Sequence, residues 1–162
     1  MRSLLVILLL LAAPSSALAA SLTLTVNTAS PITAPGVTLS GDDQTKTFTM
    51  RYTVAYTGSG NTAGWNVQAS STTLTSSGKT LPAMKVTGVT NANCTGTGCV
   101  NPTNSITWPV TLGTTATKIF NAAANTGKGT VILTATYEVS YPANALPGTY
   151  SATVTLSSAT GP

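Results

Sequence analysis

The sequence predicts an all-β protein, an antiparallel β-sandwich of roughly eight to ten strands. Apolar side chains recur at every second position in several segments, which is the period of a strand with one buried face. Clusters of Gly, Asn, Ser and Pro separate these segments, as turns separate antiparallel strands. No segment has the period of a long amphipathic helix, and residues 121–125 could form one helical turn at most.

The first segment, residues 1–19, has the features of a secretory signal peptide. Arg2 supplies a positive charge, residues 4–13 are apolar, and Ala17-Leu18-Ala19 fits the small-x-small rule for cleavage. The alternative is a membrane anchor, but the apolar run is shorter than the roughly 20 residues that span a bilayer. We therefore expect cleavage, secretion, and no transmembrane segment in the mature chain.

Residues 20–162 are expected to form a single β-sandwich domain, since no linker or internal repeat divides them. Of the seven Lys and Arg residues, six remain without Arg2, and against three Asp and Glu they leave a net charge of +3. The basic residues are scattered singly, so we expect no nucleic-acid partner. They would give a mild attraction to anionic wall polymers or lipids, which salt would screen.

Six segments with alternating apolar residues mark the expected strands. Their other positions are mostly Thr and Ser, which favour extended backbone and give each strand a hydroxyl-rich outer face. Pro109 predicts an edge strand or a bulge in the fourth segment, because proline cannot donate to a β-ladder. The apolar positions are, in chain order, Leu22, Leu24 and Val26; Phe48, Met50, Tyr52, Val54 and Tyr56; Trp65, Val67 and Ala69; Ile106, Trp108, Val110 and Leu112; Val131, Leu133, Ala135, Tyr137, Val139 and Tyr141; and Tyr150, Ala152, Val154 and Leu156.

Trp65, Trp108 and Tyr150 are the candidate contacts for a ligand or a cell-wall polymer. The two tryptophans could stack on sugar rings or lie in the core, and their apolar neighbours at alternate positions favour the core. The tyrosines also lie on apolar faces, where we expect their hydroxyl groups to reach the rims of the sheets. Tyr150 follows the Pro147-Gly148 turn, which indicates a structural corner residue.

The two cysteines, Cys94 and Cys99, flank a short loop that contains two glycines. Secretion would place them in a compartment that permits disulfides, and closing so small a ring would stabilise the fold by about 2 kcal/mol. A metal site would need further soft ligands, and the chain contains no His. We predict a disulfide that pins the loop, with a free thiol pair as the alternative.

The sequence offers little for catalysis. Without His, the chain cannot form Ser-His or Cys-His dyads. Its three acids, Asp42, Asp43 and Glu138, give no general acid–base pair and too few oxygens for calcium. If buried, Glu138 could promote a Lys–Asn crosslink, but it shares its face with Thr134 and Thr136, so we expect it in solvent. We predict a non-enzymatic protein with no catalytic residues, no cofactor and no metal site.

Several short segments resemble the WxL domain, a family of secreted bacterial proteins retained on cell walls. In that family a Gly-rich turn precedes a Trp on a strand, as in residues 58–65 here, and a Leu-containing segment follows, as in residues 78–84. A late Ala…Gly-x-Gly piece, residues 122–129, and a final Pro…Gly-Thr-Tyr strand, residues 142–150, are also similar. The resemblance covers most of residues 21–160 and implies binding to the cell wall.

The chain departs from the WxL pattern at two places. The first Trp-x-Leu is Trp65-Asn66-Val67 here, which is a mild change. The second, expected after the last tyrosine, is replaced by Leu156-Ser157-Ser158, and the family associates this second Trp with wall binding. A disulfide is not a feature that the resemblance implies.

These observations predict a secreted, non-enzymatic cell-surface protein of a bacterium. It would associate non-covalently with the cell envelope, through a cell-wall polymer such as peptidoglycan, or with other surface proteins. The alternative is a structural fibre or coat subunit, similar to a pilin, that assembles by β-strand exchange. Thr-rich edges with few charges and the strand at residues 22–26 favour such self-association.

Overall fold

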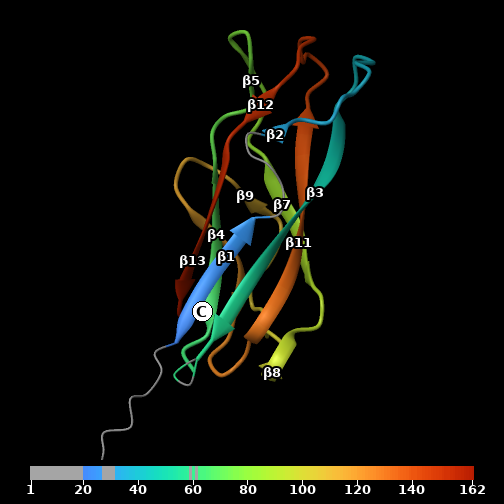
Figure 1. The fold of residues 1–162 in the computed structure, drawn as a ribbon. Coiled ribbons are helices and arrows are strands. Elements are labelled where there is room, and N and C mark those ends of the chain that lie inside the picture. The colour runs from blue at the N-terminus through green and yellow to red at the C-terminus, as the bar shows by residue number, and fades with distance from the viewer. Residues whose placement is uncertain (1–19, 27–31, 59, 61) are drawn as a thin grey trace, which may run out of the picture.

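The computed structural model describes residues 20–26, 32–58, 60 and 62–162, which form an all-β fold of antiparallel strands (Figure 1). The predicted signal peptide, residues 1–19, lies outside the described residues. In the described part of the chain, no helix has the length and apolar character needed to cross a membrane.

The largest sheet has the strand order β1-β3-β11-β7-β9. A further strand, β8, pairs with β11 on the side that β7 occupies further along. The strands of this sheet are β1 (Ser21–Val26), β3 (Gln44–Thr57), β7 (Lys85–Asn91), β8 (Thr95–Val100), β9 (Val110–Thr111) and β11 (Lys128–Tyr141).

Two smaller sheets complete the sandwich. One has the order β10-β4-β13, and its buried side chains join those of the large sheet in a single core. The other has the order β2-β12-β5-β6 and lies at the upper end of the molecule in Figure 1, which we call the tip. We call the opposite end, where β8 lies, the base. The strands are β10 (Thr117–Ala122), β4 (Trp65–Ser71) and β13 (Val154–Thr160), and β2 (Ile32–Thr33), β12 (Ser151–Ala152), β5 (Thr75–Ser76) and β6 (Lys79–Thr80).

The long pairing of β3 with β11 follows the predicted alternation. The two strands are in register from Tyr56 opposite Gly129 to Gln44 opposite Tyr141. On β11 every second residue from Val131 onward is buried, and the residues between them, Glu138 included, are partly exposed. The strands predicted from alternation at 48–56 and 131–141 are confirmed, as is the position of Glu138 on the polar face.

The strand predicted at residues 106–112 is mostly wrong. Only β9 pairs there, at the edge of the large sheet, so the edge position expected from Pro109 is confirmed. The preceding segment runs beside β10, but hydrogen bonds that involve side chains join the two segments in place of a regular backbone ladder. The Asn121 side-chain oxygen accepts a bond from the Ser105 N–H at 2.8 Å, and the Asn121 N–H donates to the Asn104 side chain at 2.9 Å.

Two other segments also differ from the predictions. The last predicted strand, residues 150–156, is divided at Thr153 into β12 and β13, which belong to different sheets. Residues 121–125 form the end of β10 and a turn rather than a helical turn. Periodicity missed β10 and β7 because register shifts in their pairing interrupt the alternation of apolar residues.

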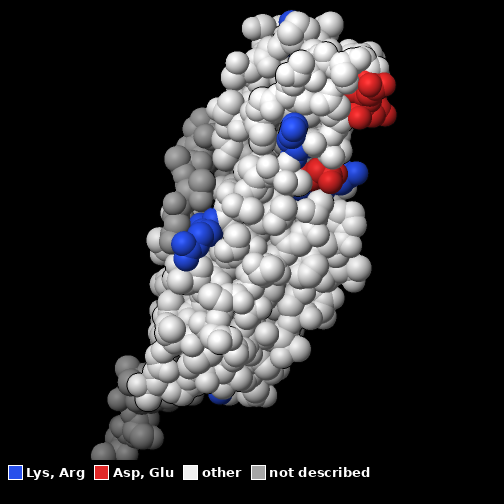
Figure 2. All heavy atoms as spheres, turned by 90° about the vertical axis from the view of Figure 1, so that its right-hand side faces the viewer, with Lys and Arg blue, Asp and Glu red and all other residues white. Residues whose placement is uncertain are grey.

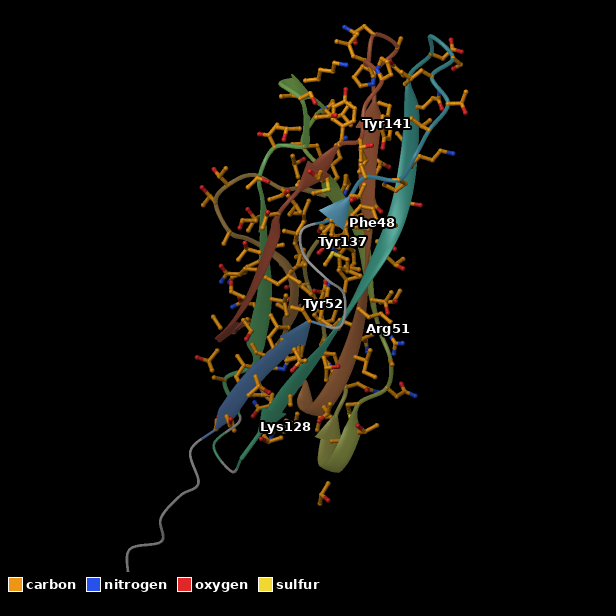
Figure 3. The ribbon with its side chains drawn as sticks, turned by 45° about the horizontal axis from the view of Figure 1, so that its top comes forward. Phe48, Arg51, Tyr52, Lys128, Tyr137 and Tyr141 are labelled. Atoms are coloured by element: carbon orange, nitrogen blue, oxygen red, sulfur yellow. A yellow bond between two sulfur atoms is a disulfide. The ribbon has the colours of Figure 1, made fainter. Side chains whose placement is uncertain are left out.

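Two tyrosine hydroxyl groups lie in the core, so the expectation that they reach the sheet rims is wrong for them. Tyr52 and Tyr137 are fully buried, and their hydroxyl groups interact with each other but with no other described group. The Tyr137 ring stacks on Phe48, with ring centroids 5.2 Å apart (Figure 3). Burial raises the pKa of Tyr52, and that of Tyr137 to about 12, because a phenolate loses its hydration there.

We predict that these two phenols make the fold sensitive to alkali. The folded chain favours their neutral form, so this stabilisation is complete below the ordinary pKa of 10.0 and is lost as the pH rises toward about 12. Each buried phenol contributes a slope of up to about 1.4 kcal/mol per pH unit. The free energy of unfolding, measured in urea across this range, should fall less steeply for Tyr137→Phe than for the unsubstituted protein. Equal slopes would show that Tyr137 ionises without unfolding.

Candidate binding groove at the tip

A groove of about 630 Å³ opens at the tip, between the segment that follows β2 and the segment that joins β11 to β12. No residue of its lining has a charged side chain. The lining consists of residues 33–37, Leu39, Tyr141 and residues 146–150. Two segments far apart in the sequence therefore form one concave, uncharged surface.

Two nearly buried tyrosines supply the aromatic part of the lining. Tyr141, the last residue of β11, donates a hydrogen bond to the Pro35 carbonyl oxygen. Tyr150 donates to the Leu146 carbonyl oxygen at 2.7 Å, a bond to the backbone four residues upstream that confirms its role as a corner residue. Burial raises the pKa of Tyr141, which favours the neutral form of this phenol.

Two exposed leucines give the groove an apolar rim. Leu146 is 55% exposed and Leu39 is 38% exposed. Among the described residues, only two other large hydrophobic side chains are exposed in this way, Val26 and Val100, and neither lines the groove. Exposed apolar side chains beside a concave, uncharged surface are typical of a site that a partner covers.

The walls of the groove are held from behind by polar contacts. Lys79, in β6, donates a hydrogen bond to the Pro147 carbonyl oxygen at 2.8 Å. Gly148 approaches β5 so closely that a Cβ atom there would lie 2.5 Å from the Ser76 hydroxyl oxygen. On the other wall, the Gln44 side chain donates to the Thr38 carbonyl oxygen at 2.9 Å. These contacts fix the positions of both walls.

Trp65 lies in the core and not in the groove. Its side chain is 0% exposed, and its indole N–H donates to the Gly127 carbonyl oxygen at 2.8 Å. The ring packs against Phe120, with centroids 5.8 Å apart. The core placement favoured by periodicity is confirmed, and the indole presents no face to a ligand in this structure.

Two of the segments that carry the WxL resemblance, residues 58–65 and 122–129, meet around Trp65. A Cβ atom at Gly64 would lie 2.3 Å from the Ala122 carbonyl oxygen, and one at Gly127 would lie 2.5 Å from the indole nitrogen. Both glycines have positive φ angles, 74° and 68°. Close packing on the Trp65 indole thus requires glycine at position 127, and close packing on the backbone at Ala122 requires it at position 64.

The remaining predicted site residues lie away from the groove. Trp108 is half-buried, and its indole N–H donates to the Ile119 carbonyl oxygen at 3.0 Å. Cys94 and Cys99 form the predicted disulfide, with Cα atoms 5.9 Å apart, in the loop that contains β8 at the base (Figure 1). Of the three candidate contacts, Tyr150 is therefore the one that lines the groove.

Sequence reasoning missed the rim leucines because neither belongs to a run with alternating apolar residues. The available signal was a large apolar residue beside turn-forming residues, as in Leu146-Pro147-Gly148. Such a residue has no strand face to bury it, so its exposure must be explained by another contact.

Comparisons with family models, curated proteins and solved structures found no match to this chain. The likeness to the WxL domain therefore stays a prediction. Across the described residues, no group of three or more His, Cys, Asp or Glu side chains is placed to hold a metal ion. The chemistry of the groove follows from its own lining, which can cover an uncharged surface with little dependence on salt.

We predict that Gly127→Ala destabilises the fold by about 2–4 kcal/mol, because the new Cβ would overlap the Trp65 indole at an unfavourable φ. Urea unfolding followed by tryptophan fluorescence measures this loss. Gly113→Ala is the matched control, since a Cβ there meets no atom within 4 Å, and its effect should stay below about 0.5 kcal/mol. Similar effects of the two variants would refute the close packing of Trp65 on Gly127.

Proposed function

We propose that this chain is a secreted, non-enzymatic surface protein of a bacterium that binds the cell envelope non-covalently through the tip groove. The partner is a cell-wall polymer such as peptidoglycan, or another surface protein. The observation that carries this proposal is the uncharged groove with Leu39 and Leu146 exposed at its rim. The features of residues 1–19 support secretion, and the WxL resemblance supports the wall as the partner.

The chemistry of the groove favours a contact that depends on shape and apolar burial. Covering a leucine side chain contributes about 1.5–3 kcal/mol when the whole side chain leaves water, and proportionally less for a partly exposed one. No lining side chain is charged, so ionic strength should hardly affect the contact. A wall polymer offers the same group many times, so a modest affinity at each site is sufficient for retention.

We predict that Leu146→Ser weakens binding of the monomer to purified peptidoglycan sacculi about tenfold, the loss expected from exposing one leucine contact. A sedimentation assay at low and high salt measures the bound fraction. Binding of the unsubstituted protein should persist at high salt. Val100→Ser is the matched control, because Val100 is 39% exposed but lies outside the groove.

Two results would contradict the proposal. Release of the protein by high salt would indicate a charged contact elsewhere on the surface. Equal retention of Leu146→Ser and Val100→Ser would show that the groove is not the contact. Retention on other surface proteins in place of sacculi, with the same dependence on Leu146, would identify the alternative partner.

Strand exchange between subunits is the second candidate function, and the position of β1 favours it. β1 lies at the edge of the large sheet and pairs with β3 from Ser21 opposite Thr57 to Val26 opposite Tyr52. Val26, its last residue, is 42% exposed. A terminal edge strand with one paired side can move to the same place on another copy without losing its contacts.

We predict that SDS-resistant ladders, if this chain forms them, require β1. Deletion of residues 21–27 should abolish them. A disulfide between Thr23→Cys and Ala55→Cys, which face each other in the β1–β3 register, should also block assembly without removing the strand. Reduction should restore the ladders of this double variant, and the reduced unsubstituted protein controls for the native disulfide. Ladders that persist in the oxidised double variant would rule out exchange of β1.

A further inference from the structure

A separate cavity, of about 260 Å³, lies at the base, where three segments meet. They are the end of β3, the disulfide loop (residues 94–99) and the start of β11. Unlike the tip groove, this base pocket is lined by a basic residue, Lys128, and Thr57 and Thr97 also belong to its lining. Figure 3 shows Lys128 at this lower end of the molecule.

Lys128 is half-buried, and no hydrogen-bond acceptor or carboxylate among the described residues is its partner. Two other lysines donate hydrogen bonds from their ammonium groups to backbone oxygens, Lys79 to Pro147 and Lys118 to Pro162. Partial burial removes some of the water around a charge and raises the cost of leaving it unpaired. The base pocket therefore contains a positive charge for which the described part of the chain supplies no counter-charge.

The acidic residues of the chain are far from this pocket. Glu138 lies ten residues along β11 from Lys128, which is about 33 Å in a strand. Asp42 and Asp43 precede the tip end of β3, a strand of fourteen residues whose other end reaches the pocket. On the face drawn in Figure 2, the acidic side chains lie only in the upper half, toward the tip. The electrostatic field at the base therefore favours an anion.

The pocket has a fixed shape because the disulfide loop packs directly on β11. A Cβ atom at Gly129 would lie 2.6 Å from the Thr95 carbonyl oxygen and 3.3 Å from the Cys99 Cβ, so the approach requires glycine. The Cys94–Cys99 bond closes the loop, and the Asn101 side chain accepts a bond from the Cys94 N–H at 2.8 Å. Residues from three segments, Lys128, Thr57 and Thr97 among them, thus line one space.

We propose that the base pocket binds a phosphate group, either free or as a phosphodiester. Lys128 supplies the positive charge, and the hydroxyl groups of Thr57 and Thr97 donate further hydrogen bonds. Donors that converge from three segments suit a tetrahedral oxyanion better than a planar carboxylate, which is met from one edge. This site is separate from the tip groove, and its binding does not depend on the proposed function of that groove.

The test is a titration of the isotope-labelled mature protein with inorganic phosphate and, separately, with dimethyl phosphate, followed by NMR. Saturable amide shifts are expected at Thr97, Gly98 and Gly129. Lys128→Gln should weaken phosphate binding about tenfold or more, the value of one charge-assisted hydrogen bond, whereas Lys128→Arg should retain it. Lys46→Gln is the matched control, because it removes the same charge from an exposed position on β3.

Each result either supports or overturns this assignment. Stronger binding of dimethyl phosphate than of inorganic phosphate would identify a phosphodiester as the natural group, and the reverse would identify a free phosphate or a monoester. Shifts that never saturate, or an equal loss in Lys46→Gln and Lys128→Gln, would show diffuse attraction and overturn the proposal. Leu146→Ser should leave phosphate binding unchanged, so failure of the groove and failure of the base pocket are distinguishable.

Discussion

The pairing of two long strands, β3 and β11, is the interaction on which the rest of the structure depends. Each has fourteen residues, and their register places the apolar side chains of both on one face. A shift by one residue would turn every one of these side chains toward water, so the register is strongly fixed. Both proposed sites depend on the same strand, because β11 begins with Lys128 in the base pocket and ends with Tyr141 in the tip groove.

The sequence predicts those strands in which the alternation of apolar and polar residues is the main determinant of the structure. Alternation identifies β3, β4 and β11 because their buried faces follow the two-residue period without interruption over most of their length. It fails where pairing contains a bulge, as in β10, or where side chains such as that of Asn121 replace backbone hydrogen bonds. The three alanines at 122–124 suggest a helical turn, but pairing of β10 with β4 overrides that local preference.

The residues of the proposed binding groove are harder to predict than the fold, because they come from segments that only the fold brings together. Trp65 lies in the core, and Gly64 and Gly127 near it have no room for a Cβ atom. These residues form a recognisable sequence pattern for a structural reason, and the pattern does not identify the groove. Tyr150 has a structural role and also belongs to the proposed site. Its hydroxyl group fixes the turn by a hydrogen bond to the Leu146 carbonyl oxygen, and the residue lines the groove. Leu39 and Leu146 do not belong to a run of alternating apolar residues, and only the folded tip brings their segments together.

The central claim is that this protein acts by contact through the tip groove. Hydrogen exchange followed by mass spectrometry, with and without purified peptidoglycan sacculi, tests it most directly because it reports the contact surface without any substitution. The account predicts added protection in residues 33–39 and 146–150, with no change in β4 around Trp65. Protection confined to the edge strand β1, or binding without added protection at the tip, would contradict it.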